Sequence, residues 1–239
     1  MRGEIKSYLG SILCDGILCI SQFLIDFYAA RGIKRHKLFL VPSTVDTDRF
    51  KIKANSPLPY NYILYCGTLT VLKDGVDILI NSYAILSKKY PDIYLVLLGK
   101  ANTLESETLL KRLACDLNIA DRVIFTGQIS RDEVPSYLMN AKILALARPS
   151  SMVADAGFPS KLTEYLSTGI PVVVTAVGEI PVYLKDGYNA YLCEPDNAET
   201  FAEKLLYVLL NYSAALEAAR NGQKLTETTF NYRFQAKRI

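Results

Sequence analysis

The sequence predicts an α/β protein built on a doubly wound parallel sheet. Half of its 239 residues are hydrophobic, and short apolar runs alternate with amphipathic segments along the chain. Wholly apolar runs are typical of strands buried on both faces, and amphipathic segments between them are typical of the helices that cover such strands. This alternation favours a parallel sheet with helices on both faces.

Each expected strand is a short run rich in Ile, Leu, Val, Tyr or Ala. The strands are expected at residues 16–20, 38–41, 63–66, 94–99, 123–125, 143–147, 172–175 and 190–192. Helices are expected between most of them. A region with the sequence Asn-Ser-Pro-Leu-Pro, within residues 54–59, would interrupt any regular element and is predicted to be a domain boundary.

The first expected helix is capped by Ser21 and closed by Gly32. A second helix follows Asp74, which could serve as its N-cap. Its apolar stripe consists of Val76, Leu79, Ile80 and Tyr83.

Later in the chain, Ser130 and Glu133 have the spacing of a capping box ahead of a helix over residues 134–139. The last three segments have helical patterns and no strands between them. They cover residues 200–210, 213–225 and 232–237.

Composition excludes several classes of function. The formal charge of +3 is small and the basic residues are scattered, so nucleic acid is not expected as a partner. His36 is the only histidine and lies in a charged turn, which leaves almost no material for a histidine metal cluster or a serine-histidine triad. Five cysteines without a C-x-x-C pair fit a reducing cytosol better than a disulfide framework.

The apolar segment over residues 8–28 raises the question of a membrane span. Asp15 and Asp26 interrupt it, and a charge near the centre of a spanning helix costs about 2.5–3.5 kcal/mol. A strand followed by a helix is therefore expected there. No apolar core with a small-residue cleavage site follows Met1, so no signal peptide is expected.

The most informative stretch covers residues 157–175, where a loop leads into a short helix and then a buried strand. Pro159 would start the helix, and Gly169 would end it. Lys161 and Glu164 are three residues apart and share one helix face. A surface ion pair worth about 0.2–0.5 kcal/mol is the simplest interpretation. A second lysine, Lys73, in a corresponding strand-to-helix turn favours a phosphate-binding site instead, because helix N-termini and lysines both attract phosphate.

In open α/β sheets, ligands bind beyond the carboxyl ends of the strands. The loops at that edge are expected at residues 67–74, 99–102, 127–130, 148–161 and 176–179. Neither a G-x-G-x-x-G fingerprint after the first strand nor a P-loop motif occurs, so the site is not predicted to be of either kind.

From Asp15 onward, the chain resembles the group 1 (family 4) retaining glycosyltransferases of the GT-B architecture, mainly their C-terminal donor domain. Two segments are similar to the end of the family's first domain and its interdomain crossing: Asp15-Gly-Ile-Leu-Cys-Ile-Ser21 and Val41-Pro-Ser-Thr-Val-Asp46. Other segments resemble its donor-domain motifs: Tyr65-Cys-Gly-Thr-Leu, Lys73-Asp-Gly-Val-Asp, residues 157–174, Gly178-Glu179-Ile-Pro181 and Asp186-Gly187.

The resemblance implies a Rossmann-like domain that binds a nucleoside diphosphate sugar. By motif position, Lys73 and Lys161 would neutralise the diphosphate, and Glu164 would hydrogen-bond the ribose hydroxyls. Gly67 would let the backbone approach the ligand, because it has no side chain. The backbone amides around three further residues would meet the distal phosphate: Phe158, Pro159 and Ser160.

Two positions depart from the family pattern. Thr68 stands where many members have arginine, so that diphosphate contact would be absent or supplied by Arg148. Ala156 stands where many members have a first glutamate, with Asp155 beside it, which leaves the contacts to the sugar hydroxyls open. The spacing of Pro159, Lys161 and Glu164 matches a Pro-x-Lys-x-x-Glu-Tyr branch of the family.

The expected domains are a remnant of an N-terminal acceptor domain with the interdomain crossing (residues 1–53), the donor domain (54–225) and a C-terminal helix (226–239). About 50 residues are too few for a complete first domain, since domains usually have about 100–150. The chain is therefore expected to be truncated, excised, or one half of a two-chain enzyme whose acceptor domain is a separate chain.

The function implied is retaining transfer of a sugar to a saccharide or lipid-linked acceptor, driven by stabilisation of the departing diphosphate. The expected location is the cytoplasm, with peripheral contact to the inner face of the membrane if the acceptor is lipid-linked. No cofactor and no metal are expected. The D-x-D spacing of Asp46 and Asp48 is interpreted as an exposed turn.

Two alternatives remain open on the sequence alone. A non-catalytic nucleotide-sugar binding module would bind the donor without transferring the sugar, even when the acceptor half is supplied. A nucleotide-sugar epimerase of the same architecture would need acid and base groups near the sugar carbon, and the scarcity of histidine weakens that interpretation.

Overall fold

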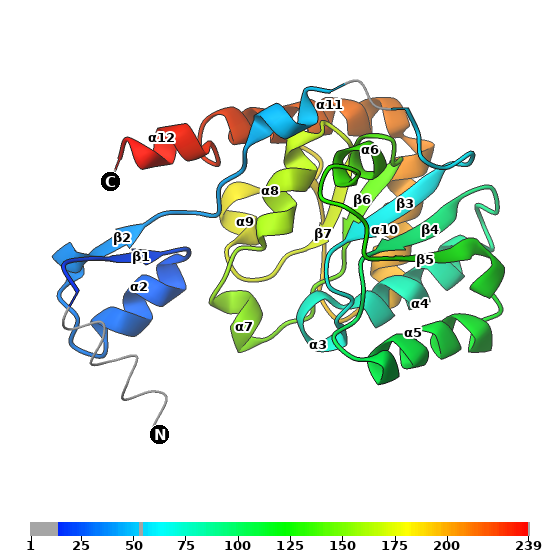
Figure 1. The fold of residues 1–239 in the computed structure, drawn as a ribbon, viewed down its shortest axis with the longest axis horizontal. Helices are drawn as coiled ribbons and strands as arrows, with labels where there is room; N and C mark the ends of the chain where they lie inside the picture. The colour runs from blue at the N-terminus through cyan, green and yellow to red at the C-terminus, as the bar shows by residue number, and fades with distance from the viewer. Residues whose placement is uncertain (1–13, 53–54, 239) are drawn as a thin grey trace.

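The computed structural model describes residues 14–52 and 55–238 and contains two separate parallel sheets (Figure 1). The first has two strands, β1 (Ile17–Cys19) and β2 (Leu38–Leu40). The second has six strands in the order β5-β4-β3-β6-β7-β8, all parallel. Its members are β3 (Tyr62–Cys66), β4 (Tyr94–Leu98), β5 (Val123–Gly127), β6 (Ile143–Leu146), β7 (Val172–Thr175) and β8 (Tyr191–Cys193).

Helices connect the strands and cover the larger sheet. The α-helices are α2 (Gln22–Ala29), α3 (Val71–Asp74), α4 (Val76–Leu86), α5 (Leu104–Asp116), α6 (Val134–Met139), α7 (Met152–Asp155), α8 (Ser160–Ser167), α9 (Ile180–Tyr183), α10 (Ala198–Leu210), α11 (Tyr212–Glu227) and α12 (Tyr232–Ala236). Three 3₁₀ turns are η1 (Arg35–Lys37), η2 (Thr47–Phe50) and η3 (Ala120–Arg122). Helices α4, α5 and α10 lie on one face of the sheet, while α6 and α8 lie on the other (Figure 1).

The predicted α/β fold with a parallel sheet is confirmed, and a strand is present at every position where the sequence predicted one. The inner strands are buried on both faces because their residues are apolar without alternation. Ile63 in β3, for example, pairs with Leu95 on one side and Ile143 on the other, and all three have no solvent exposure. The three helices expected at the C-terminus are also present as α10, α11 and α12.

Two of the predicted helix caps differ in the structure. Asp74 does not cap α4: it is the last residue of α3, its side chain is buried, and Gly75 with a φ of +64° begins α4 instead. Only half of the predicted capping box forms, since the Ser130 backbone N–H donates to Glu133 at 3.1 Å while Glu133 itself is the N-cap of α6. Ser21 does cap α2, as predicted, by accepting from the Leu24 N–H.

The first sheet and α2 form what we call the N-terminal unit, residues 17–40, which lies at one end of the molecule (Figure 1). It has a small core of its own, consisting of Cys19, Ile25, Ile33 and Leu38. Two hydrogen bonds join it to the larger part of the protein. The Ser21 hydroxyl donates to the Ala156 carbonyl at 2.7 Å, and the Gln22 N–H donates to the Glu179 carboxylate at 2.8 Å.

A crossing segment, residues 41–50, leads from the N-terminal unit to the larger sheet. It pairs with the end of the chain, because the Val45 N–H donates to the Phe230 carbonyl at 2.9 Å. Phe50 is buried in the large core, and the Phe230 ring stacks on Phe158 with 5.1 Å between centroids. The boundary predicted near residues 54–59 begins at residue 54, which lies outside the described residues. No helix in the described part of the chain is both long and apolar enough to cross a bilayer.

Candidate functional site

The direction in which successive strands are added to the larger sheet reverses between β3 and β6. From β3 the chain adds strands toward β5, and from β6 it adds strands toward β8. Ligands of doubly wound sheets bind at the carboxyl ends of the strands on either side of such a switch point. A cavity of about 540 Å³, called here the polar cavity, lies at that edge. Six residues expected at the site line it: Gly67, Thr68, Lys73, Ser160, Lys161 and Glu164.

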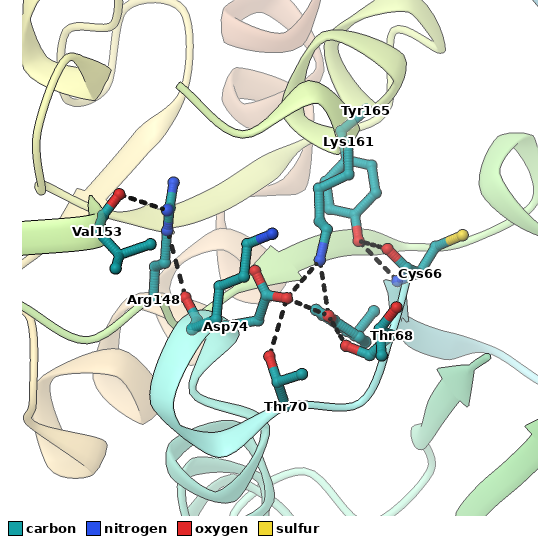
Figure 2. A network of polar contacts seen from close by, with 10 residues as sticks. Cys66, Thr68, Thr70, Asp74, Arg148, Val153, Lys161 and Tyr165 are labelled. Atoms are coloured by element: carbon teal, nitrogen blue, oxygen red, sulfur yellow. Dashed lines mark hydrogen bonds and ion pairs between the residues drawn. The ribbon is translucent and has the colours of Figure 1, made fainter. Parts of the chain in front are cut away.

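Lys161 projects from the first turn of α8 toward the loop that follows β3 (Figure 2). Its ammonium lies 2.9 Å from the Asp74 carboxylate and donates to the Tyr65 hydroxyl at 2.7 Å. Burial lowers the pKa of Lys161 below its usual value, while the negative charge of Asp74 opposes this change and the nearby charge of Lys73 adds to it. Two of the three ammonium protons therefore have partners, and the third is available to a ligand.

Asp74 is the acceptor around which this cluster is organised. One of its oxygens accepts from Thr70 at 3.1 Å and from Tyr65 at 3.0 Å, in addition to its contact with Lys161. The Asp74 side chain is only 4% exposed. Its other oxygen, Oδ1, is buried and has no hydrogen-bond partner among the described residues. The cluster holds Lys161 in one position and places a negative charge beside it.

The loop after β3 comes close to Lys161 because Gly67 has no side chain. Gly67 has a φ of +148°, and a Cβ atom there would lie 2.6 Å from the Lys161 nitrogen. Any larger residue would push the ammonium away from Asp74 and Tyr65. Tyr165, one turn further along α8, fixes the end of β3 from the other side by accepting the Cys66 N–H at 2.6 Å (Figure 2).

Glu164 lies on the same face of α8 as Lys161, as predicted, and the intervening Leu162 is buried. Its carboxylate is not paired with Lys161. It forms an ion pair with Arg49 of η2, at 2.7 Å between Oε1 and Nη1. The sequence spacing suggested a Lys161–Glu164 pair, and Arg49 was not expected as the partner of Glu164.

Lys73 is exposed near the end of α3 and lines the polar cavity. Its backbone carbonyl accepts from the Arg148 guanidinium at 3.3 Å. The structure therefore brings Lys73 and Lys161 to one cavity, although they lie 88 positions apart (161 − 73) in the sequence.

The structure places Arg148, Phe158 and Pro159 elsewhere. They line a neighbouring space of about 640 Å³, called here the apolar cavity, which α2 and α7 border. Arg148 is buried and donates to the backbone carbonyls of Lys73 and Val153 (Figure 2). Burial lowers the pKa of Arg148, and Asp74 opposes this effect. The guanidinium is thus held by backbone carbonyls. Arg148 does not line the polar cavity, so it does not replace the arginine that is absent at Thr68.

The two cavities share Lys73, Asp74, Ser160 and Lys161. The polar cavity continues from these residues toward the crossing segment, and the apolar cavity continues toward the N-terminal unit. A ligand with a charged centre and two different ends would fit this arrangement.

Several residues of the polar cavity were not expected from the sequence. Arg49, Asn102 and Arg131 line it, and the Tyr65 hydroxyl accepts from the Lys161 ammonium. Asn102 was inside a loop expected at the ligand edge, and Arg131 directly follows another. Arg49 gave no local signal of its own, because its partner Glu164 is 115 residues away.

The D-x-D segment forms a turn. Asp46 accepts the Asp48 N–H at 3.1 Å, and Asp48 forms ion pairs with Lys51 and Arg233 at 2.7 and 3.1 Å. Both carboxylates therefore have partners in η2 or in residues next to it.

The fold is a doubly wound, Rossmann-like parallel sheet, and Lys73 and Lys161 lie in one cavity at its switch point. Residues 46–225 match the family model of the glycosyl transferases group 1, and the chain belongs to this family. The resemblance noted from the sequence motifs is thereby confirmed.

Several known proteins are similar to this chain. The GDP-mannose-dependent alpha-(1-6)-phosphatidylinositol monomannoside mannosyltransferase of Mycolicibacterium smegmatis is 30% identical over 183 residues, which cover 72% of this chain and 47% of that protein. The D-inositol 3-phosphate glycosyltransferase of Streptomyces griseus is 28% identical over 174 residues, covering 70% of this chain and 36% of that protein. The chain thus spans about half, or less, of the length of these curated relatives.

Solved structures give the same fold. The C-terminal domain of LpcC, a glycosyl transferase group 1 family protein of Francisella tularensis, has a TM-score of 0.66 at 26% identity and covers 77% of this chain and 96% of that domain. Anabaena HepE in complex with UDP has a TM-score of 0.82 at 19% identity, covering 97% of this chain and 64% of that one.

Proposed function

We propose that this chain is the donor-binding half of a glycosyltransferase, which transfers a sugar from a nucleoside diphosphate sugar to a saccharide or lipid-linked acceptor. The observation that carries the proposal is the convergence of Lys73 and Lys161 on one cavity that Glu164 also lines. Family membership and the UDP complex of HepE support a donor of this class.

In the proposed complex the diphosphate lies beside the four residues that the two cavities share. Lys161 donates its third ammonium proton to the diphosphate, and Lys73 adds a second full charge. The first amides of α8, at Ser160 and Lys161, point the same way because the N–H groups at a helix N-terminus have no intrahelical partner. Gly67 allows the phosphates to approach the backbone.

The orientation of the donor follows from the lining of the two cavities. The nucleoside occupies the polar cavity, where Glu164 accepts from the ribose hydroxyls. The sugar extends into the apolar cavity beside Ala156 and Phe158. Ala156 leaves no carboxylate at the position where many family members have one.

The proposed reaction retains the configuration of the anomeric carbon. The bond between this carbon and the diphosphate oxygen breaks, and its electron pair goes to the diphosphate. The acceptor hydroxyl forms the new bond on the same face, and its proton goes to the departing diphosphate oxygen. Lys73 and Lys161 stabilise the negative charge as it develops, the effect that usually contributes most to catalysis. The proposal includes no metal and no cofactor.

The acceptor site would be completed by a further domain. We infer that residues 1–53 are the last part of an acceptor domain with the crossing, residues 54–225 the donor domain, and 226–239 a closing helix. Two strands are too few for an independently stable sheet. The remainder would be a separate chain or a preceding part of the same polypeptide, and the assembled enzyme would act in the cytoplasm or at the inner face of the membrane.

Calorimetry with UDP and GDP tests the binding site directly. Lys161→Ala and Lys73→Ala should each weaken binding by about tenfold to a hundredfold, since hydrogen bonds to charged groups contribute about 1.5–3 kcal/mol. Lys204→Ala is the matched control, because Lys204 is also ion-paired, with Asp186 at 2.8 Å, but lines a different cavity. Unchanged affinity in Lys161→Ala would remove this residue from the site, and absence of binding to both diphosphates would reject the proposal.

A further inference from the structure

The ion pair between Arg49 and Glu164 joins two parts of the protein inside the polar cavity. Arg49 belongs to η2 of the crossing segment, and Glu164 belongs to α8. The 2.7 Å contact is made by one carboxylate oxygen, Oε1, and one guanidinium nitrogen, Nη1. The side chains are 22% and 30% exposed, so both remain accessible from the cavity.

The backbone that carries Arg49 is held in place on both sides. Phe50, the next residue, is buried in the large core. On the other side, Asp46 accepts the Asp48 N–H and the Val45 N–H donates to the Phe230 carbonyl. A second nitrogen of the Arg49 guanidinium donates to the Arg131 carbonyl at 3.4 Å. The guanidinium therefore reaches Glu164 from a fixed support.

Stability alone is a weak reason for such a pair. Ion pairs with this degree of exposure contribute about 0–1 kcal/mol, because water screens the charges and two long side chains lose freedom. A role in orienting the carboxylate is better supported by the geometry, since the pair lies in the cavity and connects a rigid turn to the residue expected to meet the ribose.

We propose that Arg49 is a positioning residue for ribose recognition, an inference that rests on the proposed function. A carboxylate has about four lone-pair sites on two oxygens. Arg49 occupies one of them at Oε1, which fixes the rotation of the carboxylate and directs the other oxygen to the ribose diol of a nucleoside diphosphate. The guanidinium also balances the charge of Glu164, which would otherwise repel the incoming diphosphate.

Arginine suits this role better than lysine. Its guanidinium is planar, always charged and able to donate in two fixed directions at once. In this structure those directions are occupied by Glu164 and by the Arg131 carbonyl. A lysine at this position could supply charge but could not make both contacts in the same geometry.

The experiment compares ribonucleotides with their 2′-deoxy counterparts by calorimetry: UDP with dUDP, and GDP with dGDP. The wild-type protein should prefer the ribonucleotide by about tenfold, the loss expected for one hydrogen bond to a charged group. Glu164→Gln should reduce this preference. Arg49→Ala should reduce it below about threefold although Glu164 is intact, and Arg49→Lys should restore part of it.

Arg131→Ala is the matched control. It removes a cation from the same cavity but leaves the backbone carbonyl that Arg49 contacts. It should weaken ribo- and deoxyribonucleotides equally and leave their ratio unchanged. Circular dichroism of each variant verifies that it is folded.

The outcomes separate this inference from the proposed function. If Arg49→Ala weakens both nucleotides equally, Arg49 acts only through its charge and the positioning role is wrong. If Arg49→Ala fails to fold, the ratio of ribonucleotide to deoxyribonucleotide affinity in Arg49→Lys decides. A ratio equal to that of the wild-type protein would show that the two fixed donor directions of the guanidinium are not needed. If the wild-type protein binds none of the four diphosphates, the proposed function itself fails.

Discussion

The two parallel sheets of this protein differ in how completely they are covered. In the larger sheet, β3 is buried from Tyr62 to Tyr65 and β6 is buried along its whole length. In the N-terminal unit, α2 covers one face of the two strands, and Leu18 and Phe39 on the other face are 55% and 44% exposed. Parallel strands are normally buried on both faces.

This difference indicates which part of the chain is structurally self-sufficient. The larger sheet has helices on both faces and one continuous core. The N-terminal unit has a core of four buried residues and is hydrogen-bonded to the rest of the protein at Ser21 and Gln22. The candidate ligand site lies on the complete part, and the unit with the uncovered face lies beside it.

The largest effect should come from the core of the larger sheet. Leu64→Ala, in the strand between β4 and β6, should lower the free energy of unfolding by about 2–5 kcal/mol, because it leaves a cavity in a closely packed core. Leu18→Ala, on the exposed face, should change it by less than about 0.5 kcal/mol. Urea unfolding followed by circular dichroism measures both. Equal effects would contradict the difference between the two sheets.

Substitutions at two glycines, Gly75 and Gly16, compare the packing of the two sheets in a second way. A Cβ at Gly75, where φ is +64°, would lie 1.9 Å from the Ala147 carbonyl oxygen. The left-handed backbone conformation alone should make Gly75→Ala lower the free energy of unfolding by about 1–3 kcal/mol. The contact with the Ala147 oxygen adds to this loss. At Gly16 the Cβ would meet the Phe39 ring at 3.0 Å, and that ring can move because it is partly exposed. Gly16→Ala should have little effect in the same unfolding assay, and a large effect would show that the N-terminal unit is as closely packed as the larger sheet.

A smaller, local effect is expected where the two parts meet. Glu179→Ala removes the carboxylate that accepts the Gln22 N–H at the start of α2. The free energy required to open the N-terminal unit should fall by about 0.5–2 kcal/mol, the usual loss when a helix cap is removed. Hydrogen exchange should become faster in α2, β1 and β2 and stay unchanged in β3 and β6. Glu179→Gln, which keeps an acceptor oxygen, is the control, and faster exchange in β3 would show that the parts open together.

The smallest effect is a pH dependence that should follow Lys161, beside the larger sheet. The lowered pKa of Lys161 means that it loses its proton at a lower pH than an ordinary lysine with a pKa of 10.5. Affinity for UDP or GDP should therefore fall as the pH rises toward that value, because the positive charge is lost. Lys161→Arg should retain affinity to higher pH, since the pKa of arginine is above about 12. Identical pH profiles for the two proteins would exclude Lys161 as the titrating group.

The strands, and the positions of Lys73 and Lys161 at the carboxyl edge of the sheet, could be predicted because both depend on local patterns. Apolar runs mark buried strands, and Lys73 and Lys161 lie in short helices, α3 and α8, that follow strands at the carboxyl edge. The wrong N-cap assignment for Asp74 arose because the same spacing suits a cap or a buried acceptor, and only the packing of Tyr65 and Lys161 decides between them.

Arg148 is the opposite case. Its position after β6 suggested that it could replace the arginine absent at Thr68, but two backbone carbonyls hold its guanidinium in the neighbouring cavity. The direction of a long side chain depends on which acceptors the folded chain places around it. That information is absent from the spacing of residues along the sequence.

The α/β class and the strands along the chain follow from the amino-acid sequence, because hydrophobic periodicity is a local property. The pairing of Arg49 with Glu164, the contact of Asp74 with Lys161 and the uncovered face of the smaller sheet became known from the folded structure alone. Those contacts join residues far apart in the chain, and charges pair with whichever partner folding brings within a few ångströms.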